Sequence, residues 1–134
     1  MGKEGFGMIR GFDHIVLTVS DPEATAAFYD RALGLPMLRQ GGRLAMACGS
    51  QKINLHRAGA EIVPHAARPT PGGADFCLRA SCSLDAVIRR LEEAGVALGM
   101  GPVQRSGALG SMQSVYFRDL DGNLVEIADY QGID

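Results

Sequence analysis

An internal repeat constrains the fold of this chain more than any other feature. One strand-like run leads into a helical pattern that ends at Gly34, and a second strand-like run leads into a helical pattern that ends at Gly95. His14 and Asp75 lie 61 positions apart (75 − 14), as do the two glycines (95 − 34). A repeat of this kind indicates repeated structural units. The sequence therefore predicts an α+β fold of two β-α-β-β-β modules, whose mixed sheets curve around one cup.

The repeat also divides the chain. We expect a single domain over residues 9–130, with module 1 at about 9–58, a connector at 59–73 and module 2 at about 74–130. Three prolines and a Gly-Gly pair disfavour regular structure in the connector. The glycine-rich residues 1–8 are expected to be an N-terminal extension or a remnant of cloning, outside the domain.

The elements follow from hydrophobic periodicity and from helix-capping residues. Asp21 and Pro22 are typical of the start of a helix, and a glycine ends each helical pattern. A glycine-rich stretch, 99–110, precedes the last two strands, which a tight turn joins. The expected strands are 12–19, 37–39, 44–48, 52–57, 74–80, 114–118 and 124–128.

Composition narrows the class of partner. The chain has 134 residues and a net charge of −2, with a pI near 5.9. Such a balance gives no electrostatic reason to expect nucleic acid or an anionic membrane as a partner. No apolar run is long enough to cross a bilayer, so we expect a cytoplasmic protein. Its three cysteines, Cys48, Cys77 and Cys82, are expected to be free thiols.

Strand parity places polar side chains on the face of each sheet that the helices leave uncovered. In each strand the apolar row packs under a helix, so alternate residues point the other way. Four strands thus present polar groups to the concave side: His14, Asn54 with His56, Asp75, and Glu126. Buried charges are paired or bound to metal, so this cluster indicates a site.

Simpler interpretations exist for several of these residues. A single histidine on a half-buried strand, such as His14, is equally compatible with an ordinary hydrogen bond. Asp75 and His56 lie at strand ends, where polar residues are common, and His65 lies in the connector, where a solvated side chain is expected. Cys77 faces the cup, yet no base adjoins it in sequence, which favours a small filler over a nucleophile. Glu126 is harder to explain without a partner.

The chain resembles the vicinal oxygen chelate superfamily from about Ile9 to Tyr130. This group includes glyoxalase I, extradiol dioxygenases, fosfomycin-resistance enzymes and bleomycin-binding proteins, and the small glyoxalase-domain-containing proteins are the most similar type. The first-strand histidine and the ending Asp-x-Asp-Gly-Asn-x-x-Glu carry the resemblance. The matching segments are Phe-Asp-His-Ile-Val-Leu at 12–17, 27–35, Lys-Ile-Asn-Leu-His at 52–56, Arg105-x-Gly107 and 116–126.

The resemblance implies a divalent metal ion in the cup. His14 and Glu126 match the ligand pattern of the superfamily, and Glu126 is also the expected catalytic residue. His56 is the expected third ligand and Asp75 the fourth. Asn54 occupies the place of a fourth-strand carboxylate, and Asp75 stands where a fifth-strand histidine is common, so the chain departs from the pattern at both positions. A mixed nitrogen and oxygen set suits Zn, Ni, Fe or Mn.

The implied function is an enzyme that chelates a small oxygenated substrate for lyase, isomerase or dioxygenase chemistry. Arg105, Asn54 and Tyr116 are the expected substrate-binding residues, and Arg105 is equally compatible with a solvated loop. We also expect a homodimer, because short strands with half-covered edges favour pairing. The alternative is a non-catalytic small-molecule binding protein, similar to the drug-resistance members, with a degenerate metal site.

Overall fold

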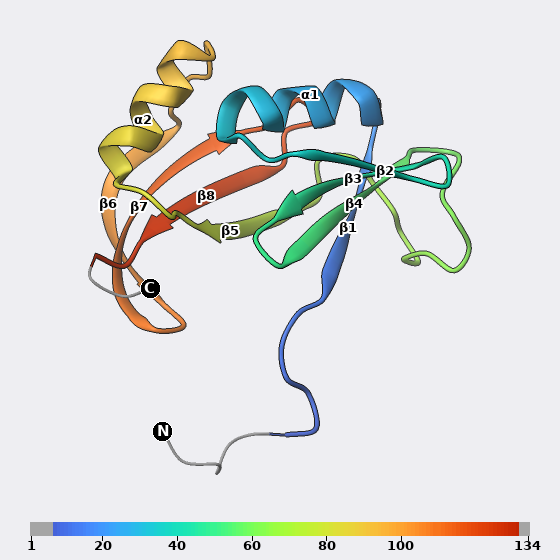
Figure 1. The fold of residues 1–134 in the computed structure, drawn as a ribbon, viewed down its shortest axis with the longest axis horizontal. Coiled ribbons are helices and arrows are strands. Elements are labelled where there is room, and N and C mark those ends of the chain that lie inside the picture. The colour runs from blue at the N-terminus through green and yellow to red at the C-terminus, as the bar shows by residue number, and fades with distance from the viewer. Residues whose placement is uncertain (1–6, 132–134) are drawn as a thin grey trace.

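The computed structural model of the chain describes residues 7–131 and contains two consecutive modules of the same design (Figure 1). Residues 1–6 of the expected extension lie outside the described residues. Module 1 consists of β1 (His14–Val19), α1 (Pro22–Leu33), β2 (Met37–Gln40), β3 (Arg43–Cys48) and β4 (Gln51–Arg57). Module 2 consists of β5 (Asp75–Arg79), α2 (Leu84–Glu93), β6 (Met100–Gly107), β7 (Gly110–Arg118) and β8 (Leu124–Asp129).

Each module forms its own four-stranded mixed sheet. Sheet A has the order β1-β4-β3-β2 and sheet B the order β5-β8-β7-β6, with β1 parallel to β4 and β5 parallel to β8. The predicted α+β fold of two β-α-β-β-β modules is therefore confirmed. Among residues 7–131, no strand of sheet A is hydrogen-bonded to a strand of sheet B, so the two sheets are not closed into one. Among residues 7–131, no helix is long and apolar enough to cross a membrane.

The residues predicted to start and stop the helices do so by hydrogen bonding and backbone geometry. The Asp21 carboxylate accepts from the Ala24 N–H at 3.2 Å, and Pro22 begins α1. Gly34 ends α1 with φ +73°, a left-handed conformation that glycine adopts without a steric penalty. In α2 the cap is Ala94, one residue before the predicted Gly95, which has φ +76°.

The glycine-rich stretch 99–110 contains β6, a strand that the sequence pattern did not locate. Two of its glycines, Gly101 and Gly107, are closely packed against neighbouring groups. A side chain on Gly107 would collide with the Tyr130 hydroxyl, and one on Gly101 would collide with the Ser114 carbonyl of β7. Here glycine permits close approach of neighbouring groups, a requirement that resembles a loop signal in sequence.

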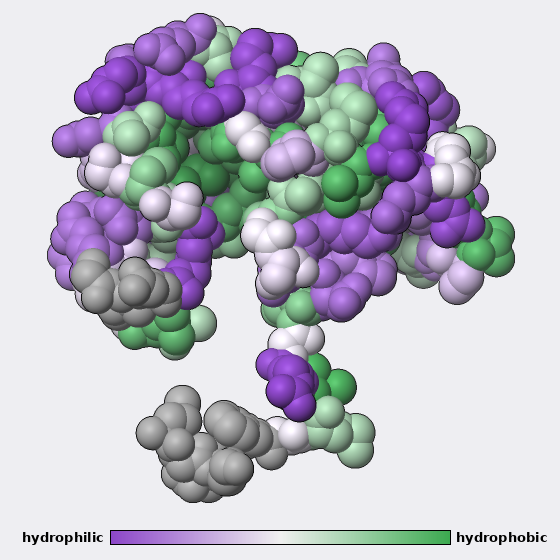
Figure 2. All heavy atoms as spheres, in the orientation of Figure 1, coloured by the Kyte–Doolittle hydropathy of each residue, from purple (hydrophilic) through white to green (hydrophobic). Residues whose placement is uncertain are grey.

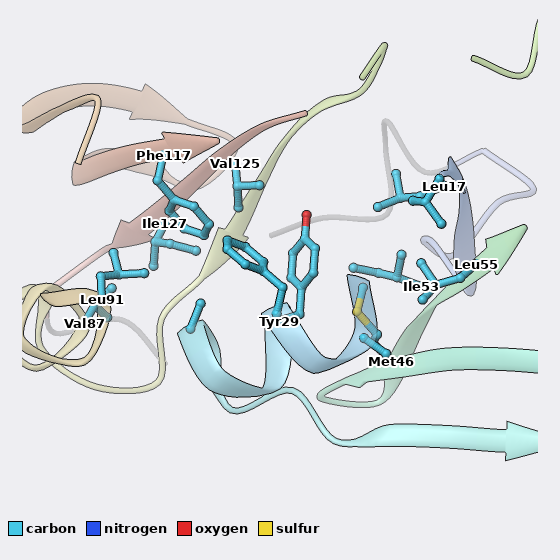
Figure 3. Close-up of a cluster of buried hydrophobic side chains, with 14 of the residues drawn as sticks. Leu17, Tyr29, Met46, Ile53, Leu55, Val87, Leu91, Phe117, Val125 and Ile127 are labelled. Carbon is cyan, nitrogen blue, oxygen red and sulfur yellow. The ribbon is translucent and has the colours of Figure 1, made fainter. Parts of the chain in front are cut away.

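One hydrophobic core joins the two modules (Figure 3). Tyr29 of α1 lies between side chains from both sheets, and its neighbour Phe28 contacts Phe117 of β7 with ring centroids 6.2 Å apart. Helix α1 thus packs on its own sheet and also reaches sheet B. The labelled core residues of Figure 3 are Leu17, Met46, Ile53 and Leu55 on one side, and Val87, Leu91, Phe117, Val125 and Ile127 on the other.

A buried carboxylate fixes the turn before β8. Asp119 is 7% exposed, and its Oδ2 accepts from the Tyr29 hydroxyl at 2.6 Å and from the Asn123 amide at 2.9 Å. Its Oδ1 accepts from the backbone N–H groups of Asp121 and Asn123, both at 3.0 Å. Burial, together with the bond to Asp119, raises the pKa of Tyr29 well above its usual value, so this hydroxyl stays a donor. The turn is therefore bonded to the first module.

We expect Tyr29→Phe to lower the free energy of unfolding by about 1–3 kcal/mol, because it leaves a buried carboxylate oxygen with one donor fewer. Urea unfolding of the purified protein measures the change. Tyr116→Phe is the matched control. It removes a hydroxyl whose partner is the exposed Arg105, and should change stability by less than about 0.5 kcal/mol. Equal losses in the two variants would contradict a special role for the Asp119 bond.

Candidate functional site

The uncovered face of sheet A carries the polar residues of module 1. In the β1–β4 register Val16 lies opposite Asn54, and Thr18 lies opposite His56, while His14 lies opposite Lys52. Paired residues share a face of a sheet. His14, Asn54 and His56 therefore lie on one face, as their parity predicts. A cavity of about 440 Å³ lies against this face, and both Asn54 and His56 line it.

His14 is half-exposed at the free edge of sheet A, since β1 is an edge strand. Its Nδ1 lies 2.8 Å from the Asp13 carboxylate. A carboxylate on one ring nitrogen fixes the ring orientation and leaves the other, Nε2, to bind a ligand. Asp13 was not among the residues predicted from sequence. Its position beside a candidate metal-binding histidine is a signal that was available there.

His56 carries a buried polar atom without a partner. Its Nδ1 is inaccessible to solvent and has no hydrogen bond among the described residues. Buried polar atoms are nearly always hydrogen-bonded, so such an atom needs an explanation. His56 also lines a second cavity with Val16, Thr18 and His65, where the connector folds against β1 and β4.

The uncovered face of sheet B carries the polar residues of module 2. Glu126 of β8 lies opposite Cys77 of β5 and opposite Tyr116 of β7. A cavity of about 470 Å³ lies here, lined by Asp75, Arg105, Tyr116 and Glu126. Figure 2 shows the molecule hollowed below β5 and β8. Glu126 Oε2 is a buried atom without a hydrogen-bond partner in the described part of the chain.

Arg105 is held over the same cavity by four contacts, one of which runs from its Nη1 to the Gln104 carbonyl at 3.1 Å. Its Nε donates to the Tyr116 hydroxyl at 3.0 Å, and its guanidinium lies 5.6 Å from the centroid of the Tyr116 ring. Its Nη2 lies 3.4 Å from the Met100 sulfur. Sequence analysis did not find Met100, because its strand lies in the glycine-rich stretch. A stacked, hydrogen-bonded arginine is well placed to bind an anionic group.

Cys77 adjoins Glu126 but is a poor nucleophile. Burial and the negative charge of Glu126 raise the pKa of the Cys77 thiol to about 11. The thiol is therefore almost fully protonated at neutral pH, and only the thiolate reacts. All three cysteines are free, as predicted.

The predicted site residues thus fall into two groups in one chain. Sheet B brings Asp75, Arg105, Tyr116 and Glu126 to one cavity, and sheet A brings Asn54 and His56 to another. Within residues 7–131, no three His, Cys, Asp or Glu side chains lie together in a group that could hold a metal ion. The predicted ligand set His14, His56, Asp75 and Glu126 is accordingly divided between two half-sites. The assembly of these four residues into one metal site remains a prediction.

The family follows from comparison with known proteins. The model of the Glyoxalase/Bleomycin resistance protein/Dioxygenase superfamily matches residues 11–127, which include the candidate site residues of both sheets. The chain belongs to this superfamily. Its members include enzymes as well as resistance proteins, as the name states, so membership establishes the superfamily and the fold but leaves the reaction open.

The individual proteins that this chain resembles include an enzyme and a binding protein. Virulence protein STM3117 from Salmonella typhimurium is 45% identical over 92% of this chain and 86% of its own length, and its crystal structure superposes with a TM-score of 0.89. A lactoylglutathione lyase from Agrobacterium tumefaciens is 26% identical with a TM-score of 0.69, over 92% of this chain and 98% of that chain. The antibiotic binding protein TnmS3 from Streptomyces sp. CB03234 has the same identity and coverage, with a TM-score of 0.71.

We expect Cys77, studied with Cys48 and Cys82 changed to serine, to react with iodoacetamide at pH 8 roughly 100-fold more slowly than a thiol of ordinary pKa. This ratio follows from a pKa of about 11 against the usual 9.0. Adding Glu126→Gln removes the charge, so the rate should rise, while the effect of burial remains. Mass spectrometry over time measures both rates. Identical rates would contradict a contribution of Glu126 to the raised pKa of Cys77.

Proposed function

We propose that this protein is a divalent-metal-dependent enzyme of the glyoxalase/dioxygenase type. Its substrate is a small oxygenated molecule, and the reaction is of the lyase, isomerase or dioxygenase class. The observation that carries the proposal is the buried Glu126 Oε2, which lacks a partner among residues 7–131. A buried carboxylate oxygen without a donor is costly, and a bound cation offsets that cost. His56 Nδ1 is a second such atom, on the other sheet.

The donor set fits a divalent ion. Imidazole nitrogens from His14 and His56 and carboxylate oxygens from Glu126 and Asp75 suit Zn, Ni, Fe or Mn. The Asp13 carboxylate beside His14 Nδ1 supplies the outer support that ligating histidines usually have. When bound, such an ion acts as a Lewis acid towards two adjacent substrate oxygens.

A homodimer is the arrangement that unites the half-sites. Strand β1 is a free edge of sheet A and β5 a free edge of sheet B, and the candidate ligands lie on or next to these two edges. We propose that β1 and β4 of one subunit face β5 and β8 of the other, so that each site takes His14 and His56 from one subunit and Asp75 and Glu126 from its partner. Exposed strand edges favour such association.

The remaining residues of the site bind and orient the substrate. Arg105, fixed by Tyr116, holds an anionic part of it, and Asn54 donates or accepts a hydrogen bond from the opposite sheet. Glu126 is placed to move a proton as well as to bind metal. Cys77 stays protonated and takes no part as a nucleophile. We further propose that the protein acts in the cytoplasm and that the domain spans residues 9–130.

The alternative function is non-catalytic binding of a small molecule by a degenerate metal site. Two observations favour it. Asn54 supplies no carboxylate where the superfamily commonly has one, and TnmS3, an antibiotic binding protein, is as similar to this chain as the lactoylglutathione lyase. A measurement of metal binding distinguishes the metal-dependent enzyme from the non-catalytic binding protein.

Metal titration followed by melting temperature provides the test. We expect wild-type protein to bind one divalent ion per chain and to melt at a higher temperature with metal, because the ion binds only the folded state. Glu126→Gln, His14→Ala and His56→Ala should lose most of both effects, whereas Glu93→Gln, at an exposed position on α2, should lose neither. Without metal, Glu126→Gln should not destabilise the fold. Unchanged metal content in all variants would leave the binding protein as the leading function.

Light scattering tests the dimer. We expect a mass of about twice 14.2 kDa at micromolar concentration. Val16, 44% exposed on β1, would lie in the interface, so Val16→Lys should yield monomers that still fold. Met37→Lys, on the opposite edge strand β2, is the control and should remain dimeric. A monomeric wild type would exclude the shared site.

A further inference from the structure

The cavity on sheet A is bordered by short alanine side chains of β3 and by longer polar side chains. On the uncovered face, β3 carries Arg43, Ala45 and Ala47 in succession. Ala45 lies opposite Asn54 of β4, and Ala47 lies opposite Lys52. Ala45 lines the cavity, and its short side chain leaves space that a longer residue would fill. Arg43, Lys52 and Asn54 stand around the cavity of about 440 Å³, whose size is that of a small-molecule site.

This cavity is positively charged. Arg43 and Lys52 both line it, and no aspartate or glutamate does so among the described residues. Within residues 7–131, neither cation forms an ion pair with a carboxylate. The cavity on sheet B differs in this respect, because Asp75 and Glu126 balance its arginines. Two cations line this cavity and no carboxylate among the described residues does, which favours the binding of an anion.

An amide adds a further hydrogen-bonding group to the cavity. The Asn54 amide lines the same cavity and offers a hydrogen-bond donor. Arginine offers a planar fork that matches a carboxylate or phosphate, and lysine adds a point charge. The residues around this cavity are therefore donors suited to an oxyanion.

We propose that the sheet A cavity binds the anionic group, carboxylate or phosphate, of a small molecule, with Arg43 and Lys52 as the binding residues. Lys52 is the register partner of His14, so one end of the cavity adjoins a proposed metal ligand. A molecule anchored by its anionic group would extend from here towards the metal. The identification of this molecule as the substrate rests on the proposed function. Anion binding itself requires only residues of sheet A.

Nuclear magnetic resonance titration of chelator-treated, metal-free protein tests the site. Succinate and glycerol phosphate are titrated separately at constant ionic strength, which keeps screening of the charges equal. We expect saturable shifts of backbone amides within residues 43–56, and the tighter of the two anions identifies the preferred class. Arg43→Gln and Lys52→Gln should each weaken binding at least about tenfold, and Arg43→Lys by less. Arg68→Gln, at an exposed connector residue, should bind as wild type does.

Two results would overturn the proposal. One is the absence of saturable shifts with either anion, and the other is equal affinity in the wild type, Arg43→Gln and Lys52→Gln. Because Arg43 is exposed and Lys52 is not fully buried, unchanged melting temperatures are expected for these variants, and they verify folding. The metal titration is performed without either anion. Failure of the anion site is thus distinguishable from failure of the metal site.

Discussion

The position of the sheet B half-site relative to module 1 depends on the buried Asp119 carboxylate. Its four hydrogen bonds hold the turn between β7 and β8, and one of them comes from Tyr29 on the helix of the other module. Asn123, bonded to this carboxylate, also accepts from the Ala74 N–H just before β5. Glu126 follows three residues later, so the same bonds fix where β8 presents it. A buried charge needs several partners, and here those partners link the modules.

Features with a short-range cause could be predicted from the sequence. The period of two in the strands placed His14, Asn54 and His56 on one face, and the registers agree. Asp21 and Gly34 bound the first helix because capping depends on local hydrogen bonds and backbone angles. The repeat itself predicted two modules, since each one repeats the same local pattern.

Features that depend on contacts between residues far apart in the chain could not be predicted from the sequence. Gly101 and Gly107 belong to a strand because of what packs against them, which only the folded chain reveals. Asp119 lies in the tight turn that the sequence predicted before the last strand. Its hydrogen bond to Tyr29, 90 positions away, does not affect the hydrophobic pattern of the sequence and could not be read from it. The positive cavity is an intermediate case. Lys52 has the same strand parity as Asn54 and His56, so its position on their face of sheet A was predictable. That no carboxylate among the described residues lines the cavity depends on the whole fold.

The division of the proposed site between two sheets has a consequence for regulation. Each sheet supplies candidate ligands that the other lacks: sheet A has the imidazoles of His14 and His56, and sheet B has the carboxylates of Asp75 and Glu126. A chain that holds both halves apart keeps a buried carboxylate oxygen unpartnered among its described residues. Association that brings the halves together would relieve this cost, and bound metal would stabilise the dimer in turn, because the two equilibria are linked. Metal affinity and dimer affinity would then rise and fall together.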